Sequence, residues 1–217
     1  MLFFTPQPTQ GSEEFRGLRS KLYQIREQRP LRTILITSPL PNEGKSFVTA
    51  NLAQAIACQE GRKVLLIDGD LRNGRLHEFL GAPRGPGLSE YLLNESDETG
   101  IIKRGPMDNL ALITLGRHVA NPAELLANGR LKNLLTQTES VFDWIVIDSP
   151  PVIPVTDPTI LADYCDGVLM VVRADSTPSD AARRAQNAFS EKQLIGSVLN
   201  GMPTASIPYY GAYNHNS

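Results

Sequence analysis

The residue types best suited to chemistry gather first in a loop, residues 38–46, which reads Ser-Pro-Leu-Pro-Asn-Glu-Gly-Lys-Ser. It follows a short apolar run and leads directly into a helical stretch, so the backbone N–H groups of loop and helix converge on one point and can bind phosphate oxygens. Lys45 can neutralise the β- and γ-phosphates of a nucleotide, and the Ser46 hydroxyl can ligate Mg²⁺. Pro39 stands where the general motif has its first glycine. We expect the phosphate-binding residues to be Asn42, Glu43, Gly44, Lys45, Ser46 and Phe47.

Three acids follow two other apolar runs. Residues 64–67 lead into Asp68-Gly69-Asp70-Leu71-Arg72, and residues 144–147 lead into Asp148. Ligands bind at the edge of an α/β sheet where the carboxyl ends of its strands meet. These acids could instead cap helices or satisfy turn amides, but carboxylates that share an edge repel each other unless a cation joins them. The sequence therefore predicts a Mg²⁺ site at Ser46, Asp68 and Asp148, in a centre whose catalytic residues are Lys45, Asp68, Asp70 and Asp148.

The elements that must position these residues alternate along the chain. Short, nearly continuous apolar runs are typical of strands that are covered on both faces, and such strands are usually parallel. Helical stretches lie between the runs, and this alternation predicts an α/β fold with a mostly parallel wound β-sheet and helices on both faces. The strands are expected at 33–37, 64–67, 110–114, 144–147, 168–172 and 195–199, and the helices at 12–28, with Ser12 as N-cap, 45–57, 122–138, 156–164 and 179–192.

Composition limits the other possibilities. The 217 residues, 41% of them hydrophobic, suffice for one domain over 12–202, between a flexible start at 1–11 and a mobile tail at 203–217. A formal net charge of -2 gives no attraction to nucleic acid. Cys58 and Cys165 are expected to be buried thiols in a reducing cytoplasm, and the three histidines lack the spacing of a zinc site. No apolar run is long enough for direct membrane insertion, so any membrane connection must come through a partner.

The combination of Ser-Pro-x-Pro-Asn-Glu-Gly-Lys-Ser, Ile-Asp-Gly-Asp-Leu-Arg and Ile-Asp-Ser-Pro-Pro resembles three motifs of the bacterial tyrosine kinases, or BY-kinases, of capsular and exopolysaccharide biosynthesis. These motifs are the P-loop, the A′ acid motif and the B motif. The wider superfamily comprises the deviant-Walker, MinD/ParA-like P-loop ATPases, whose partitioning and septum-placement members carry a second loop lysine where this chain has Leu40. That difference favours the kinase branch. Further matches lie at 87–92, 121–126 and 171–174, so the resemblance spans roughly 13–202.

The resemblance implies an ATP- and Mg²⁺-dependent protein-tyrosine autokinase that regulates polysaccharide polymerisation and export. In such an enzyme either Asp68 or Asp70 could accept the proton of the tyrosine hydroxyl, and the sequence leaves this choice open. Asn200 resembles the asparagine of the superfamily that contacts adenine. The family phosphorylates tyrosine clusters like the one formed here by Tyr209, Tyr210 and Tyr213.

Glu13, Arg16 and Arg19 lie three residues apart, which places them on one stripe of a helix and resembles the inter-subunit motif of the family. The resemblance therefore implies a ring-like homo-oligomer, and a transmembrane polysaccharide co-polymerase or activator that recruits a cytoplasmic chain to the inner face of the membrane. Two alternatives remain open. One is a MinD/ParA-like ATPase switch that recruits a partner without tyrosine phosphorylation, and the other is a regulator that binds nucleotide and acts only through ring assembly.

Overall fold

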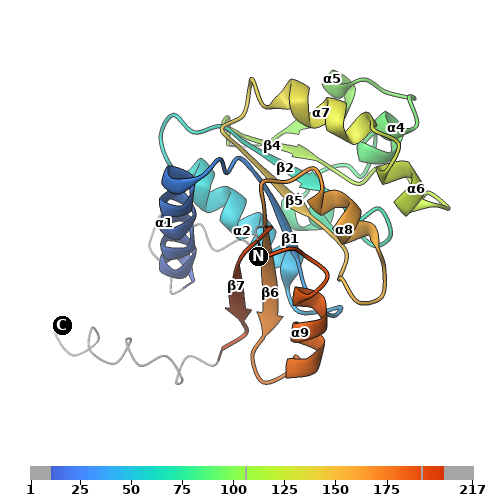
Figure 1. Ribbon diagram of the computed structural model, residues 1–217. Coiled ribbons are helices and arrows are strands. Elements are labelled where there is room, and N and C mark those ends of the chain that lie inside the picture. The colour runs from blue at the N-terminus through green and yellow to red at the C-terminus, as the bar shows by residue number, and fades with distance from the viewer. Residues whose placement is uncertain (1–10, 106, 192, 203–217) are drawn as a thin grey trace.

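A computed structural model describes residues 11–202, apart from residues 106 and 192 (Figure 1). The expected flexible start and the three tail tyrosines, Tyr209, Tyr210 and Tyr213, lie outside the described residues.

The centre of the described fold is a seven-stranded sheet in the order β3-β4-β2-β5-β1-β6-β7. Neighbouring strands are parallel, except that β3 runs antiparallel to β4 at one edge. The predicted α/β class and the six predicted strands are confirmed, with ends shifted by one residue at most, whereas β3 was not foreseen. The strands are β1 (Thr33–Thr37), β2 (Val64–Asp68), β3 (Ile102–Arg104), β4 (Leu110–Ile113), β5 (Trp144–Asp148), β6 (Gly167–Arg173) and β7 (Leu194–Asn200).

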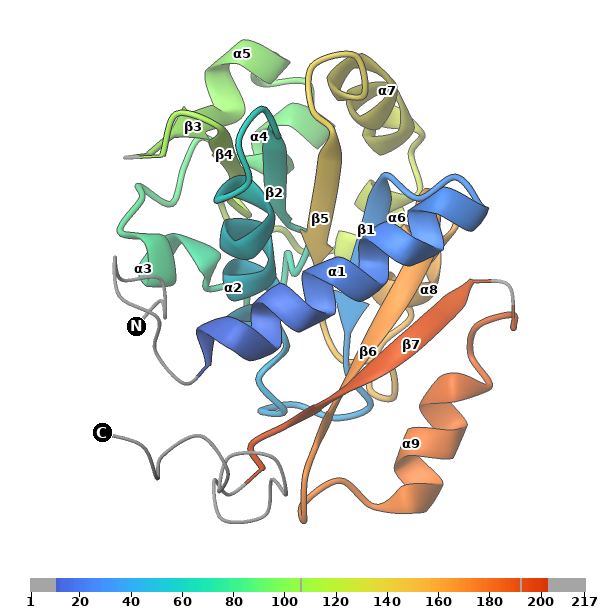
Figure 2. The ribbon, with the colours of Figure 1, turned by 90° about the vertical axis from the view of Figure 1, so that its left-hand side faces the viewer.

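Both faces of this sheet are buried, which explains the continuous apolar runs. Along β1, Leu35 packs into one core, while Ile34 and Ile36 pack into the other. Figure 2 shows α1 and α2 in front of the sheet and α6 and α8 behind it. The helices are α1 (Ser12–Gln28), α2 (Lys45–Ala57), α3 (Leu76–Leu80), α4 (Leu88–Leu92), α5 (Glu98–Ile101), α6 (Pro122–Leu126), α7 (Arg130–Thr138), α8 (Asp157–Ala162) and α9 (Ser179–Gln186).

Several local predictions were wrong. The expected helix at 122–138 is two helices, because Gly129 adopts a left-handed conformation (φ +81°) that a helix cannot contain. The helix that starts at 179 ends at Gln186, well before residue 192. Ser12 is not the N-cap: Gly11 takes that position, and Ser12 is the first helical residue and is buried. Cys58 is exposed rather than buried, because it follows the last turn of α2 at the surface.

Candidate nucleotide site

The phosphate loop connects β1 to α2 and turns tightly at two positions. Asn42 and Gly44 both adopt left-handed conformations, with φ of +63° and +88°. A Cβ atom on Gly44 would lie 2.1 Å from Nδ2 of Asn200, so only glycine fits there. The turn places Lys45 and Ser46 in the first turn of α2, at the carboxyl end of β1. The backbone therefore has the strand, loop and helix order that a phosphate site requires.

Contacts from distant segments hold this loop in shape. The buried Glu43 carboxylate accepts a hydrogen bond from the Leu40 N–H at 2.9 Å and another from the Thr177 hydroxyl. The Asn200 side-chain amide donates to the Glu43 carbonyl at 2.9 Å, and Arg173 Nη1 donates to the Asn42 carbonyl at 3.1 Å. The sequence predicts that Glu43 and Asn200 contact the nucleotide, whereas in the structure their side chains bind the loop itself. The contact from Thr177 was not predicted, because no motif includes this residue.

Asp148 lies at the end of β5, in register with Asp68 on β2. It is fully buried and accepts hydrogen bonds from the Ser46 hydroxyl and, at 3.1 Å, from the Thr49 hydroxyl. Burial raises the pKa of Asp148 to about 6, while the charge of Lys45 and the hydrogen bond from Ser46 act in the opposite direction. Two of the three residues predicted to hold a metal, Ser46 and Asp148, are therefore in direct contact. The hydrogen bond from Thr49 to Asp148 was not predicted from the sequence.

Asp68 is also fully buried, beneath the backbone of the loop that follows β2. Its Oδ2 accepts a hydrogen bond from the Leu76 N–H at 3.1 Å, whereas its buried Oδ1 has no hydrogen-bond partner among the described residues. A Cβ atom on Gly74 would lie 2.2 Å from that oxygen, which shows how closely the loop covers it. Burial, followed by the charge of Asp148, raises the pKa of Asp68 well above its ordinary value. Asp68 thus lies behind the loop rather than on the open face of the site.

Asp70 is buried as well, but it borders a cavity beside the phosphate loop. Its Oδ2 lies 3.8 Å from the Lys45 ammonium, and its Oδ1 accepts hydrogen bonds from the N–H groups of Arg72 and Asn73. Asp70, Lys45 and Ser46 line a cavity of about 630 Å³ that also contains Arg72. Of the two acids that the sequence could not tell apart, only Asp70 borders this cavity.

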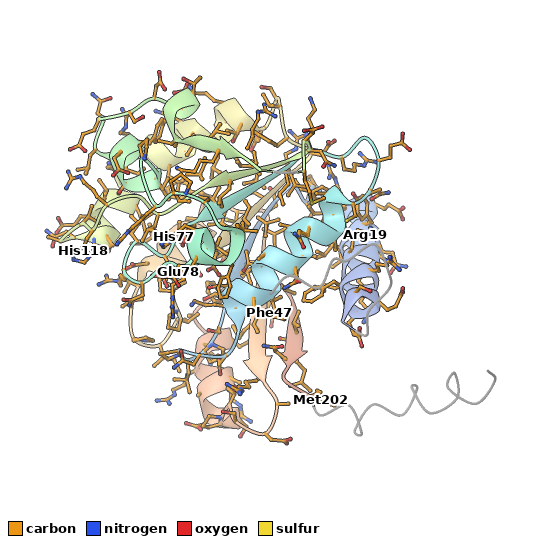
Figure 3. The ribbon with its side chains drawn as sticks, turned by 180° about the vertical axis from the view of Figure 1, so that it is seen from behind. Arg19, Phe47, His77, Glu78, His118 and Met202 are labelled. Carbon is orange, nitrogen blue, oxygen red and sulfur yellow. The ribbon has the colours of Figure 1, made fainter. Side chains whose placement is uncertain are left out.

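Phe47 and Asn200 belong to a second hollow, of about 620 Å³, on the side of the loop that faces α1 and β7. The Phe47 ring packs edge-on against Phe15 of α1, with 6.2 Å between the ring centroids. Figure 3 shows Phe47 at the start of α2 and Arg19 of α1 near its other end. Phe47 and Asn200, both predicted to contact the nucleotide, therefore line the same hollow beside the phosphate loop.

The donor set fits Mg²⁺ bound together with a nucleotide. Within the described residues, no group of three or more His, Cys, Asp and Glu side chains forms a metal cage. Mg²⁺ in nucleotide sites needs no such cage, because phosphates and water supply most of its oxygen ligands. The Ser46 hydroxyl and the Asp148 carboxylate, which are in contact, are the protein oxygens that would complete such a site. Asp68, also predicted as a metal ligand, lies beneath the loop at Gly74.

The predicted stripe on α1 is only partly exposed. Glu13 and Arg16 form an ion pair at the surface. Arg19 instead donates from Nη1 to the Ala55 carbonyl of α2 at 2.7 Å. Arg19 therefore links α1 to α2 within its own subunit.

The sheet, the loop and the acids at the strand ends define a P-loop nucleotide-binding protein of the α/β class. Residues 32–180 match the family model described as AAA domain. Tyrosine-protein kinase YwqD of Bacillus subtilis is 32% identical over 215 residues, which cover 98% of this chain and 90% of the relative. The structure of the chimerical protein CapA2B2 superposes with a TM-score of 0.87 at 34% identity, covering 93% of this chain and 90% of that one. The chain belongs to the family of bacterial tyrosine-protein kinases.

Some relatives are much longer. Tyrosine-protein kinase wzc of Salmonella typhimurium is 33% identical over 94% of this chain, but the match covers only 29% of that protein. In the part of this chain that the structure describes, no helix has the length and apolar character needed to cross a membrane.

Proposed function

We propose that this chain is an ATP- and Mg²⁺-dependent protein-tyrosine autokinase that regulates polysaccharide polymerisation and export. The observation that carries the proposal is the convergence of Lys45, Ser46 and Asp70 on one cavity, with Asp148 in contact with Ser46. The names of the relatives, tyrosine-protein kinases, support transfer to tyrosine. The catalytic domain is 12–202, and the acceptor tyrosines are Tyr209, Tyr210 and Tyr213.

Catalysis in such a site rests on positioning and charge neutralisation. Loop N–H groups and the Lys45 ammonium bind the β- and γ-phosphates, and the Ser46 hydroxyl and Asp148 hold the metal. Mg²⁺ held by Ser46 and Asp148 would supply neutralisation of charge on the phosphate oxygens. Asp70 accepts the phenolic proton, because it borders the cavity that Lys45 also lines, whereas Gly74 covers Asp68.

We further propose that the chain assembles into a ring through the Glu13 and Arg16 surface of α1. A transmembrane polysaccharide co-polymerase or activator would then recruit it to the inner face of the cell membrane. The match covers only 29% of one longer relative, and the proposal is that a separate partner fills the role of such additional sequence here.

Replacing Lys45 by Met tests the proposed reaction. Loss of the ammonium should lower the rate of tyrosine phosphorylation by about 10²–10³-fold while the fold survives. Phosphate on tyrosine, mapped by mass spectrometry after incubation with ATP and Mg²⁺, is the measurement. Lys63→Met, at an exposed lysine just before β2, is the matched control and should leave the rate unchanged.

Three outcomes separate the candidate functions. Tyrosine phosphate in the wild type and its loss in Lys45→Met support the kinase. ATP turnover without tyrosine phosphate would instead indicate a nucleotide switch. Nucleotide binding with neither reaction would indicate a regulator that acts through assembly.

A further inference from the structure

Arg72, the last residue of the A′ motif, forms a two-pronged ion pair with Asp157, which belongs to none of the motifs, and the proposed reaction gives neither residue a role. Arg72 Nε donates to Oδ2 of Asp157 at 2.8 Å, and Nη2 donates to Oδ1 at 2.9 Å. The Asp157 carboxylate is fully buried at the start of α8, whereas the Arg72 side chain is 37% exposed. The hydrogen bonds with Asp157 raise the pKa of Arg72, so its guanidinium stays charged.

The exposed part of Arg72 faces the phosphate site. Arg72 lines the same cavity as Lys45, Ser46 and Asp70. Its backbone N–H donates to Asp70 Oδ1 at 3.2 Å, so both its main chain and its side chain are held in place. The pair with Asp157 uses Nε and Nη2, which leaves the two N–H groups of Nη1 outside the pair and available to an anion.

We propose that Arg72 is a second cationic catalytic residue for phosphoryl transfer and that Asp157 is the positioning residue that holds it; this rests on the proposed kinase function. In the transfer, the acceptor phenolic oxygen forms a bond to the γ-phosphorus while the bond from that phosphorus to the β–γ bridging oxygen breaks. The electron pair of the broken bond leaves with ADP, and the phenolic proton passes to Asp70. Nη1 of Arg72 donates to a non-bridging γ-phosphate oxygen, whose charge it neutralises during transfer.

If the pair served only the stability of the fold, a folded variant that lacks both residues would keep the wild-type kcat. A buried carboxylate needs a partner, and removing only one member of such a pair is strongly destabilising. Replacing both members by apolar residues of similar size, however, is often neutral for stability. The double variant Arg72→Met with Asp157→Leu therefore separates stability from catalysis.

The experiment measures kcat and KM for ATP in tyrosine phosphorylation, together with Tm, for the full chain. We expect the double variant to melt close to the wild type but to lose about 10²–10³-fold in kcat, with little change in KM. Asp157→Asn, which keeps the shape but not the charge, should lower kcat less, because Arg72 remains present. Glu95→Gln is the matched control, because Arg117 makes the same two-pronged contact to Glu95 at a surface outside the cavity. Its kcat should not change.

Chemical rescue decides the question even if the double variant does not fold. Millimolar guanidinium chloride should restore part of the kcat of Arg72→Ala, and sodium chloride at the same concentration should not. A folded Arg72→Ala protein that guanidinium fails to rescue would overturn the inference, as would a double variant with wild-type kcat. If Lys45→Met is inactive while the double variant is fully active, only the role of Arg72 fails. If Lys45→Met is itself active, the proposed function fails.

Discussion

At the scale of single residues, the site buries two carboxylates close together, and their burial costs free energy of folding. Asp68 and Asp148 are fully buried opposite each other in the sheet, and their pKa values are raised chiefly by that burial. A charged group that is excluded from water costs free energy unless an opposite charge compensates it. Lys45 compensates only in part, so the ligand-free protein stores an unfavourable interaction that a cation would relieve.

This balance predicts the effect of Asp148→Asn on stability. Because the pKa of Asp148 is raised from 3.8 to about 6, the folded protein binds this proton more tightly than the unfolded chain does. The stabilising contribution of the protonated group is fully present below about pH 4 and is lost as the pH rises through about 6. Above that pH, we expect Asp148→Asn to be more stable than the metal-free wild type by on the order of 3 kcal/mol, and inactive.

Urea unfolding in EDTA at pH 4 and pH 7.5 measures the effect. The difference in the free energy of unfolding between variant and wild type should grow between the two pH values. Asp163→Asn, at an exposed acid, is the control and should show no such growth. An Asp148→Asn protein that is less stable than the wild type at pH 7.5 would show that the carboxylate is already compensated.

At the scale of elements, α1 is part of the core and not an appended arm. Phe15 and Leu22 are buried against the α2 side of the sheet. The Tyr23 hydroxyl accepts a hydrogen bond from the buried Trp144 indole at 3.1 Å, and the Arg26 guanidinium lies 4.7 Å from the centre of the Trp144 ring. The helix is thereby fixed in orientation, and its Glu13 and Arg16 side chains face away from the subunit.

The arginines of α1 should respond differently to charge reversal. Arg16→Glu should weaken assembly without a measurable loss of stability, because an exposed ion pair such as that with Glu13 contributes little. Arg19→Glu should in addition lower the free energy of unfolding by about 1 kcal/mol, because the Ala55 carbonyl loses its donor. Light scattering gives the oligomer mass and urea unfolding gives the stability. Lys21→Glu, an exposed change on the same helix, is the control.

The assembly proposal depends on the Arg16 result. An Arg16→Glu protein with an unchanged oligomer mass would remove the support for an interface at this surface. A wild type that stays monomeric with and without nucleotide would do the same.

At the scale of the whole molecule, the ends of the described chain lie beside the nucleotide site. Gly11 and Met202 both line the hollow that contains Phe47 and Asn200. Tyr209 follows Met202 by seven residues, which bounds its reach at about 25 Å even if the chain is fully extended. This reach does not exclude the chain's own site, so the expectation rests on the proposed ring, in which we expect each chain to phosphorylate the tail of another chain.

Mixed assemblies test transfer between chains. A Lys45→Met chain with an intact tail is combined with an active chain that lacks residues 208–217, and phosphate is mapped by mass spectrometry. Phosphate at Tyr209, Tyr210 or Tyr213 of the Lys45→Met chain can only come from its neighbour. Lys45→Met mixed with a truncated Lys45→Met chain is the control and should stay unlabelled. Active ATP turnover with no phosphate on these tyrosines would favour the switch-type alternative.

The sequence by itself determined the class of fold and which residues meet at the carboxyl edge of the sheet. Apolar runs without alternation indicate strands buried on both faces, and the carboxyl ends of parallel strands share one edge, so Lys45, Ser46 and Asp148 had to meet. This prediction needs only local sequence, because each residue lies at the carboxyl end of its own strand or in the loop and helix that follow it. The prediction of one helix at 122–138 failed near Gly129, where a single left-handed residue divides it into two.

Only the tertiary structure decided which side chains face the cavity and what holds them. Asp68 and Asp70 are two residues apart, and the sequence could not separate them, but the loop at Gly74 covers the first and leaves the second beside Lys45. Arg72 meets Asp157 across 85 residues, and Glu43 meets Thr177 across 134. Such pairs depend on how helices and loops pack around the finished sheet, and neither periodicity nor motif spacing encodes that packing.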